Sequence, residues 1–351
     1  MSASSTQNQK TLFVVGAGAS SEVKLPIGSA LAGSIASALN FIVSRRDVIS
    51  GDDLIYQALC DEVKNNSSAN IGTLIQASQR IRDAMPQAIS IDNFIDQHSD
   101  DKQIELCGKL AIVREILKKE RSSLLFVNPS NSYNKMNFEP LKETWFASFW
   151  KLLTENCEAK DLEQRFNKIA FVIFNYDRCI EQYLYCSLQN SYRIDAQAAA
   201  RLVKSIEIYH PYGTVGSLPW QGIDNPIVYG DEPTTNQLLE IAKQVRTFTE
   251  VTVNESSEVS SIRTHMMTSP RIVFLGFAFH RLNVKLLAPL REPTSKLEYR
   301  HIYASTHGLS EDDIYLIADE LKGRDALTIF KTKNVLCNKL FYEFWRSLSF
   351  V

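Results

Sequence analysis

Asn175 and His210 are the side chains of this 351-residue chain best suited to chemistry. Asn175 follows the apolar run Ile169–Phe174 and His210 follows Ser205–Tyr209, so each is expected where a strand ends. A neutral amide both donates and accepts hydrogen bonds, which suits it to hold a hydroxyl group or a water. An imidazole accepts a proton near neutral pH. The pair predicts proton transfer at the edge of a sheet, with a structural histidine as the alternative.

Glycine turns follow two other apolar runs. The first is Gly16-Ala17-Gly18-Ala19-Ser20, after Thr11–Val15, and the second is Gly276-Phe277, after Arg271–Leu275. Glycines let a backbone turn sharply and approach a pyrophosphate, whose charge suits the start of the next helix. The first turn departs from the dinucleotide fingerprint, because Ser21 stands where a third glycine or alanine belongs. Both turns are candidate nucleotide contacts, and a purely structural turn is the alternative.

Five further residues are weaker candidates. Pro26 lies in a rigid loop after the first glycine turn, Gly213 lies in the turn after the histidine, and His280 follows the late glycine turn. Asp92 and Asp177 carry carboxylates that can accept hydrogen bonds from a sugar. The alternative for these two acids is a structural one, because each lies in a segment that reads as the capped start of a helix.

The order of the apolar runs predicts an α/β fold. From Ile169 onward strands alternate with helices, which implies a Rossmann-like, mostly parallel sheet with helices on both faces. Residues 45–168 are almost wholly helical in their apolar spacing, so we expect a large helical subdomain inserted after the first strand and helix, within one domain spanning residues 1–351. Expected strands beyond those named above are Pro226–Tyr229, Tyr299–Ala304 and Ala326–Phe330; Thr234–Val251 reads as one helix and Glu255–Ser261 as a polar loop.

Composition narrows the class of protein. The formal net charge of −2 gives no reason to expect nucleic-acid binding. Six scattered cysteines without a Cys-x-x-Cys pair argue against a structural zinc and against a disulfide framework. No apolar run approaches the roughly 18 residues of a membrane span, and the polar first residues lack an apolar signal core. We therefore expect a cytoplasmic protein with no membrane partner and no metal.

Taken together, the motifs resemble the sirtuin-like NAD-binding superfamily, in its bacterial branch rather than its deacetylase branch. The resemblance spans roughly residues 11 to 290. It rests on Gly16–Ser20 with Leu25–Gly28, on Asn175-Tyr176-Asp177, on His210-Pro211-Tyr212-Gly213, on Ser90–Phe94 and on Val273–Phe277. The chain departs from the family in two respects. It has no four-cysteine zinc module, and Pro211 and Tyr212 stretch the histidine motif.

The resemblance implies an NAD⁺ glycohydrolase that releases nicotinamide and ADP-ribose, with NAD⁺ as substrate and no prosthetic group. It implies catalytic roles for Asn175 and His210. It implies antiviral defence by depletion of NAD⁺, in a homo-oligomer or beside a partner ATPase that gates activity. The implied NAD-contacting residues are Gly16, Ala17, Gly18, Ala19, Ser20, Pro26, Asp92, Asp177, Gly213, Gly276 and Phe277.

Three other functions stay open at this point. The first is a sirtuin-like deacylase or ADP-ribosyltransferase, which would transfer an acyl group or ADP-ribose; the missing zinc module weakens that interpretation. The second is a regulatory module that binds NAD or ADP-ribose and catalyses no reaction; such a module would not need both Asn175 and His210. An ordinary oxidoreductase is disfavoured by the poor fingerprint and by the large helical insert.

Overall fold

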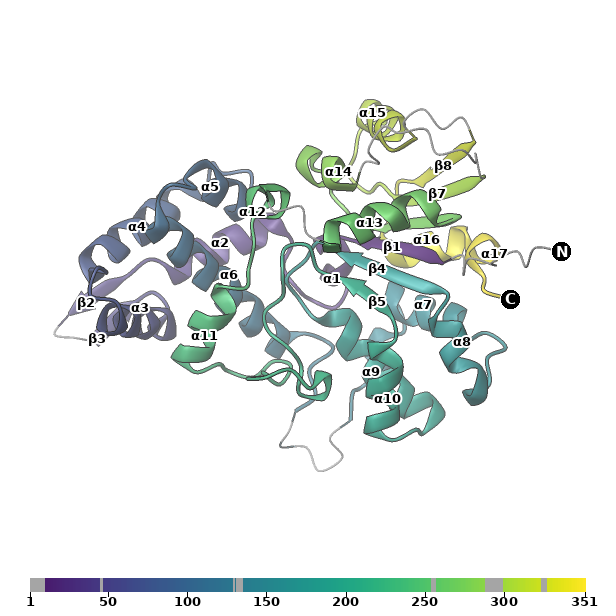
Figure 1. Cartoon of the computed structure of the whole chain (residues 1–351), viewed down its shortest axis with the longest axis horizontal. Helices are drawn as coiled ribbons and strands as arrows, with labels where there is room; N and C mark the ends of the chain where they lie inside the picture. The colour runs from purple at the N-terminus through teal and green to yellow at the C-terminus, as the bar shows by residue number, and fades with distance from the viewer. Residues whose placement is uncertain are drawn as a thin grey trace.

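A six-stranded parallel sheet forms the centre of the protein, in a computed structural model that describes residues 10–44, 47–128, 130, 135–253, 257–287, 299–322 and 327–351 (Figure 1). Its strand order is β5-β4-β1-β6-β7-β8. Numbered along the chain, the six parallel strands thus follow the order 3-2-1-4-5-6 of the doubly wound Rossmann sheet. The predicted α/β Rossmann-like fold is confirmed. The strands are β1 (Thr11–Val15), β4 (Ile169–Ile173), β5 (Glu207–Tyr209), β6 (Arg271–Leu275), β7 (Arg300–Ser305) and β8 (Thr328–Lys333).

The central strands are apolar along their whole length because helices cover both sheet faces. All five residues of β1 are buried, and so are all five of β4. Side chains alternate between the faces along a strand. Leu12 and Val14 accordingly pack into one core, whereas Phe13 and Val15 pack into the other. Val15 lies in register with the last residues of β4 and β6, so the loops that follow these strands start at the same edge.

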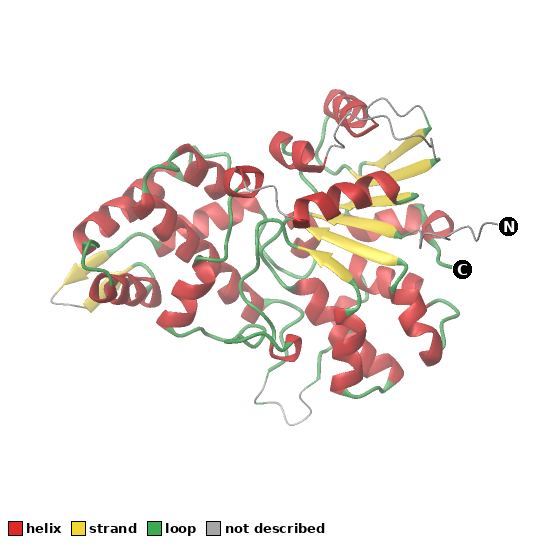
Figure 2. Cartoon of the chain, in the orientation of Figure 1, coloured by secondary structure: helices red, strands yellow, loops and turns green. Residues whose placement is uncertain are grey.

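Helices from different parts of the chain cover the two faces (Figures 1 and 2). One face packs against helices that come before and after β4 and against a helix near the carboxyl terminus; these are α7 (Trp145–Thr154), α8 (Leu162–Phe166), α9 (Cys179–Tyr192), α10 (Ala196–Lys204) and α16 (Cys337–Glu343). The opposite face packs against later helices, which are α13 (Ser257–Thr268), α14 (Arg281–Leu287) and α15 (Glu311–Lys322). The short helices α1 (Ala17–Ser21) and α17 (Trp345–Leu348) complete this part.

A helical lobe extends from the carboxyl edge of the sheet (Figure 1). Its central helix is α6, which buries twelve of its residues. Two helices from later in the sequence, α11 and α12, join the lobe, so it is not built from the inserted segment alone. The lobe comprises α2 (Gly28–Ala38), α3 (Asp53–Asn65), α4 (Ile71–Ala84), α5 (Ile91–Gln97), α6 (Lys102–Ser122), α11 (Thr235–Ala242) and α12 (Phe248–Val253).

A hairpin that the sequence did not indicate lies where the inserted segment begins. Strands β2 (Ile42–Ser44) and β3 (Asp47–Ser50) form an antiparallel hairpin between α2 and α3. Residue 45, where the predicted subdomain begins, lies outside the described residues. The helix after the first glycine turn, α2, ends at Ala38, and the short strand β2 follows it.

The strand expected at Pro226–Tyr229 is wrong, because this segment is a loop. Ile227 and Tyr229 are buried, which explains the apolar residues that read as a strand. Their burial comes from packing under the loop rather than from a ladder. The backbone N–H of Ile227 donates to the carbonyl oxygen of Ser217, and the Ile227 carbonyl accepts from Arg178.

Two expectations for the segment after residue 234 are also wrong. The single helix expected at Thr234–Val251 is divided into α11 and α12. The interruption lies where the N–H of Arg246 donates to the carbonyl oxygen of Tyr212, which draws the backbone out of the helical ladder. Most of the polar loop expected at Glu255–Ser261 belongs to α13, since that helix begins at Ser257; residues 255 and 256 lie outside the described residues.

In the part of the chain that the structure describes, no helix is both long and apolar enough to cross a membrane. The same residues contain no group of three histidine, cysteine or acidic side chains placed to hold a metal ion.

Candidate functional site

The two glycine turns meet between β1 and β6, at the switch point of the sheet where ligands bind in doubly wound folds. The N–H of Gly18 donates to the carbonyl oxygen of Gly276 at 3.0 Å, and that of Gly16 donates to Leu275 at 3.0 Å. A Cβ atom at Gly276 would lie 2.0 Å from the nitrogen of Ala19. Glycine is therefore required here for the close approach of two backbone segments of this chain. One amide predicted to face a phosphate is used by the protein itself.

Replacing Gly276 with alanine is expected to destabilise the protein by several kcal/mol. Gly276 has a φ of +54°, a conformation that costs other residues roughly 1–3 kcal/mol, and the added methyl group would also collide with backbone. The midpoint of urea unfolding measures the effect. Gly33→Ala is the matched control, since this exposed residue of α2 has open space around it and alanine favours a helix by about 1 kcal/mol. Equal midpoints for the two variants would contradict this account of the turn.

Helix α1, which carries the end of the first glycine turn, is anchored by Glu22. Its carboxylate accepts from the N–H of Trp145 at 2.7 Å and from the N–H of Asn338 at 2.9 Å. It thereby caps the starts of α7 and α16. Burial raises the pKa of Glu22, although these hydrogen bonds oppose the rise. The indole N–H of Trp145 also donates to the carbonyl oxygen of Ala19 at 2.9 Å, so α7 holds the backbone of the first glycine turn in place.

Asn175 joins the first glycine turn to the histidine loop. It lies two residues beyond β4, and its side-chain amide donates to the hydroxyl oxygen of Ser20 at 3.0 Å. The backbone carbonyl oxygen of Asn175 lies 3.4 Å from Nδ1 of His210. Only 8% of Asn175 is exposed. The structure thus brings three of the predicted loops into one hydrogen-bonded row at the carboxyl edge of the sheet.

His210 is paired with Glu181, a residue that the sequence analysis missed. Nε2 of His210 lies 2.8 Å from Oε1 of Glu181, in the first turn of α9. Burial by itself would lower the pKa of His210, but the carboxylate outweighs this effect and raises the pKa above the ordinary histidine value. An acidic residue at the start of a helix is commonly explained by the helix dipole. Nothing next to Glu181 in the sequence points to His210, which lies 29 positions later.

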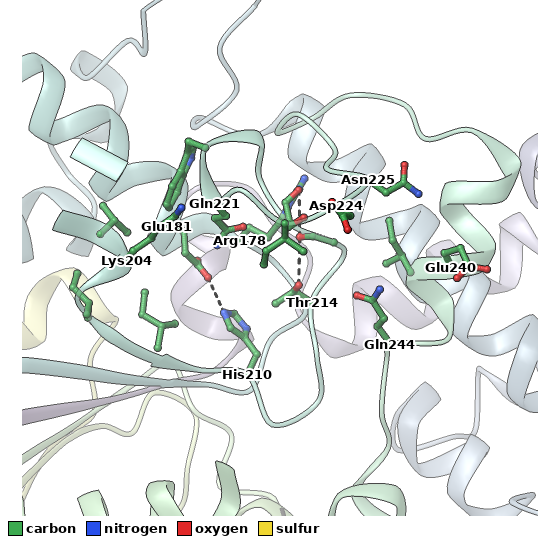
Figure 3. A pocket seen from close by; sticks show the side chains of 18 residues that line it. Arg178, Glu181, Lys204, His210, Thr214, Gln221, Asp224, Asn225, Glu240 and Gln244 are labelled. Carbon is green, nitrogen blue, oxygen red and sulfur yellow. Dashed lines mark hydrogen bonds and ion pairs between the residues drawn. The ribbon is translucent and has the colours of Figure 1, made fainter. Parts of the chain in front are cut away.

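A cavity of about 480 Å³ opens beside the His210–Glu181 pair (Figure 3). Both side chains line it, together with Lys204 at the end of α10, Glu240 on α11 and Asp224 in the loop between them. The volume falls within the roughly 300–1,000 Å³ of small-molecule pockets. Among the described residues that line this cavity there is neither Asn175 nor a member of the glycine turns. His210 is therefore the residue that connects the hydrogen-bonded row to the cavity.

The wall of this cavity is fixed by a buried ion pair between Arg178 and Glu120. Nε of Arg178 donates to the Glu120 carboxylate at 3.0 Å, and a second guanidinium nitrogen contacts its other oxygen. Arg178 is 1% exposed and Glu120 is fully buried. A further nitrogen of Arg178 donates to the carbonyl oxygen of Ile227 at 2.8 Å. This pair therefore ties helix α6 of the lobe to the segment that follows Asn175.

The two predicted carboxylates make structural contacts. Oδ1 of Asp177 accepts from the N–H of Cys179, the first residue of α9, at 3.1 Å; the N-cap position itself is held by Arg178. Oδ1 of Asp92 accepts from the hydroxyl group of Tyr176, and this bond joins the start of α5 to the loop after β4. Burial raises the pKa of Asp92, and the Tyr176 hydrogen bond partly opposes that rise. Asp92 therefore connects the lobe to the site.

The remaining predicted residues lie around this row. Phe277 belongs to a buried aromatic cluster, 4.9 Å from the ring of Phe174 and 5.1 Å from that of Phe279. Gly213 has a φ of +80° and packs against the backbone of Gln244, which no side chain at that position would allow. Two residues lie outside the row: Pro26 is half-buried between α1 and α2, and His280 is exposed just before α14.

Comparisons with known proteins add no relative to this geometry: no family model matches the chain, and no curated protein gives a significant match. The resemblance to sirtuin-like proteins therefore stays a prediction from the motifs.

Proposed function

We propose that this protein hydrolyses NAD⁺ between nicotinamide and ribose, releasing nicotinamide and ADP-ribose. One observation carries the proposal. Asn175 and His210, from loops after neighbouring strands, are linked through the backbone carbonyl of Asn175, while the side-chain amide of Asn175 donates to Ser20 of the glycine turn at the switch point. In this sheet order the crevice beyond the strand ends is the usual place for a dinucleotide. The site would thus combine a place for the pyrophosphate with an amide and an imidazole beside the ribose.

Cleavage of the nicotinamide–ribose bond requires the protein mainly to position the substrate and a water. Nicotinamide leaves as a neutral molecule, so the bond breaks through an oxocarbenium-like transition state without a general acid on the leaving group. The protein has to hold the ribose, direct a water at its anomeric carbon and accept a proton. Asn175 supplies an amide for the ribose or the water, and His210 supplies the base. Gly16–Ser20 and Gly276 would contact the dinucleotide.

The proposal predicts that activity falls in acid. The neutral form of His210 accepts the proton, and Glu181 raises the pKa of this histidine above its ordinary value of about 6.5. The neutral fraction therefore decreases as the pH falls through that raised pKa, so kcat should begin to drop at a higher pH than an unperturbed histidine would give. Rates measured from pH 5.5 to 9 test this. A rate that is constant down to pH 6 would exclude His210 as the base.

Product analysis separates this proposal from the other functions considered. Incubation with NAD⁺ should give free ADP-ribose and nicotinamide in equal amounts. Acyl-linked or protein-linked ADP-ribose would indicate group transfer instead. A change in nicotinamide absorbance would indicate hydride transfer. Tight NAD⁺ binding without any product, also with cell lysate added, would indicate a regulatory binding module.

The cellular role that we propose rests on the resemblance alone. A cytoplasmic enzyme that depletes NAD⁺ would halt viral replication at the expense of the host cell. Such an enzyme needs a trigger, which we place in self-assembly or in a partner ATPase. Expression in infected cells tests the role, since NAD⁺ should fall with the wild type and persist with the Asn175→Ala variant.

A further inference from the structure

One carboxylate, that of Glu181, makes a direct hydrogen bond to the ring of His210. Glu181 is 4% exposed, and its Oε1 atom lies 2.8 Å from Nε2 of His210. Its Oε2 atom is buried and, within the described part of the chain, has no hydrogen-bond partner. A buried carboxylate with one unpartnered oxygen is costly unless a cation lies beside it. His210 is the group that meets this need when it takes up a proton.

Arg178, another cation at this cavity, is hydrogen-bonded to other groups. It lies one turn before Glu181, at the start of α9, and lines the same cavity. Its guanidinium group is shared between the Glu120 carboxylate and the carbonyl oxygen of Ile227. Arg178 therefore hydrogen-bonds to Glu120, and the hydrogen bond of Glu181 goes to His210.

The two ring nitrogens of His210 face different partners. A carboxylate accepts hydrogen bonds and cannot donate them when ionised, so Nε2 must carry the hydrogen toward Glu181. In the neutral ring, Nδ1 is then the atom with a free lone pair. Nδ1 lies 3.4 Å from the backbone carbonyl oxygen of Asn175. That carbonyl is ready to accept a hydrogen bond once Nδ1 has gained a proton.

We infer that Glu181 is a positioning residue that binds Nε2 of His210 and makes Nδ1 the atom that accepts the proton released in the reaction. The inference rests on the proposed function. As water attacks the anomeric carbon, a C–O bond forms and the C–N bond breaks. The electron pair of the broken bond leaves with nicotinamide, which becomes neutral, and the proton of the water goes to Nδ1. Glu181 stabilises the imidazolium ion that results.

Other charged groups around His210 lie in less direct positions. Asp177, which precedes α9, also favours the protonated ring. The cavity beside the ring is further lined by charged groups from α9, α10, α11 and the loop between β5 and α11, namely Arg178, Lys204, Glu240 and Asp224. Glu240 is paired with Lys243 at 2.8 Å. It is therefore a suitable control, being a carboxylate on the same cavity that serves another partner.

Nitrogen-15 NMR of the histidine side chains in the full-length protein tests the inference without relying on activity. The signal of His210 is assigned by its loss in a His210→Gln variant. We expect the neutral ring to carry its hydrogen on Nε2. Glu181→Gln, which keeps the shape and an accepting oxygen, should retain this tautomer but lower the proton affinity of His210 at least about tenfold, because the charge is gone. Glu181→Ala should lose the tautomer preference, and Glu240→Gln should change neither property.

The kinetic arm uses the same variants. Glu181→Gln should lower kcat, leave KM for NAD⁺ nearly unchanged and move the acid limb of the pH profile to lower pH. A wild-type ring with its hydrogen on Nδ1, or an unchanged His210 titration in Glu181→Ala, would overturn the inference. A wild type that releases no nicotinamide, also with lysate from infected cells added to supply a trigger, while the NMR results hold would instead overturn the proposed function. The two failures are therefore distinguishable.

Discussion

Replacing Asn175 with alanine is expected to lower kcat for NAD⁺ cleavage by at least about 100-fold. Its amide is the group that can hold the ribose or the attacking water, and loss of one preorganised polar contact at a reacting centre typically costs 100- to 1,000-fold. The amide also bonds to Ser20, so the variant would leave a hydroxyl group without that partner and lose about 1 kcal/mol of stability. Nicotinamide release at saturating NAD⁺ measures the effect.

Two matched variants test whether the loss of kcat comes from the Asn175 amide itself. Asn190→Ala removes the same amide from an exposed position on α9 and should leave kcat unchanged. Ser20→Ala removes the partner of Asn175 but keeps the amide, so its rate should fall between those of the wild type and Asn175→Ala. If Asn175→Ala turns over NAD⁺ at the wild-type rate, the catalytic role assigned to this residue is wrong.

Replacing Glu120 with alanine is expected to give the largest loss of stability, about 3–5 kcal/mol. The substitution leaves the guanidinium group of Arg178 buried without its counter-charge, and an uncompensated buried charge carries a penalty of this size. It also removes the acceptor for the N–H of Gly230, which bonds to the same carboxylate at 3.1 Å. The midpoints of thermal and urea unfolding measure the loss.

The control for this prediction is an ion pair on the surface. Glu139 bonds to Lys142 at 2.6 Å, but both side chains are more than half exposed. Glu139→Ala should therefore cost less than about 1 kcal/mol, because solvent screens exposed pairs. Comparable losses for the two variants would mean that the Glu120–Arg178 pair does not tie the lobe to the sheet.

Much of the sheet could be predicted from local sequence. Ile169–Phe174 is a continuous apolar run, and a strand covered on both faces has to be apolar along its length. The same reasoning failed at Pro226–Tyr229, where apolar residues pack beneath a loop. There the backbone is bonded to Arg178 and Ser217 rather than to a strand. Nothing local to residues 226–229 indicates those distant partners.

For the candidate site, the positions of the loops could be predicted from the sequence, but the contacts between them could not. The loops after β1, β4 and β5 could be placed at one edge, because parallel strands end together. Gly18 reads as a phosphate contact until Gly276 is seen to accept its hydrogen bond. Glu181 resembles an ordinary first-turn acid until the short strand β5 brings His210 to it. Both depend on a register between elements far apart in the chain.

The measurement that tests the central claim most directly is the reaction of NAD⁺ with the purified wild-type protein in water enriched in oxygen-18. The account predicts that nicotinamide leaves without label and that ADP-ribose gains one heavy oxygen, because the C–O bond formed at the anomeric carbon comes from water. Lysate from infected cells is added in a parallel reaction to supply a trigger. Release of neither product under both conditions would contradict the account.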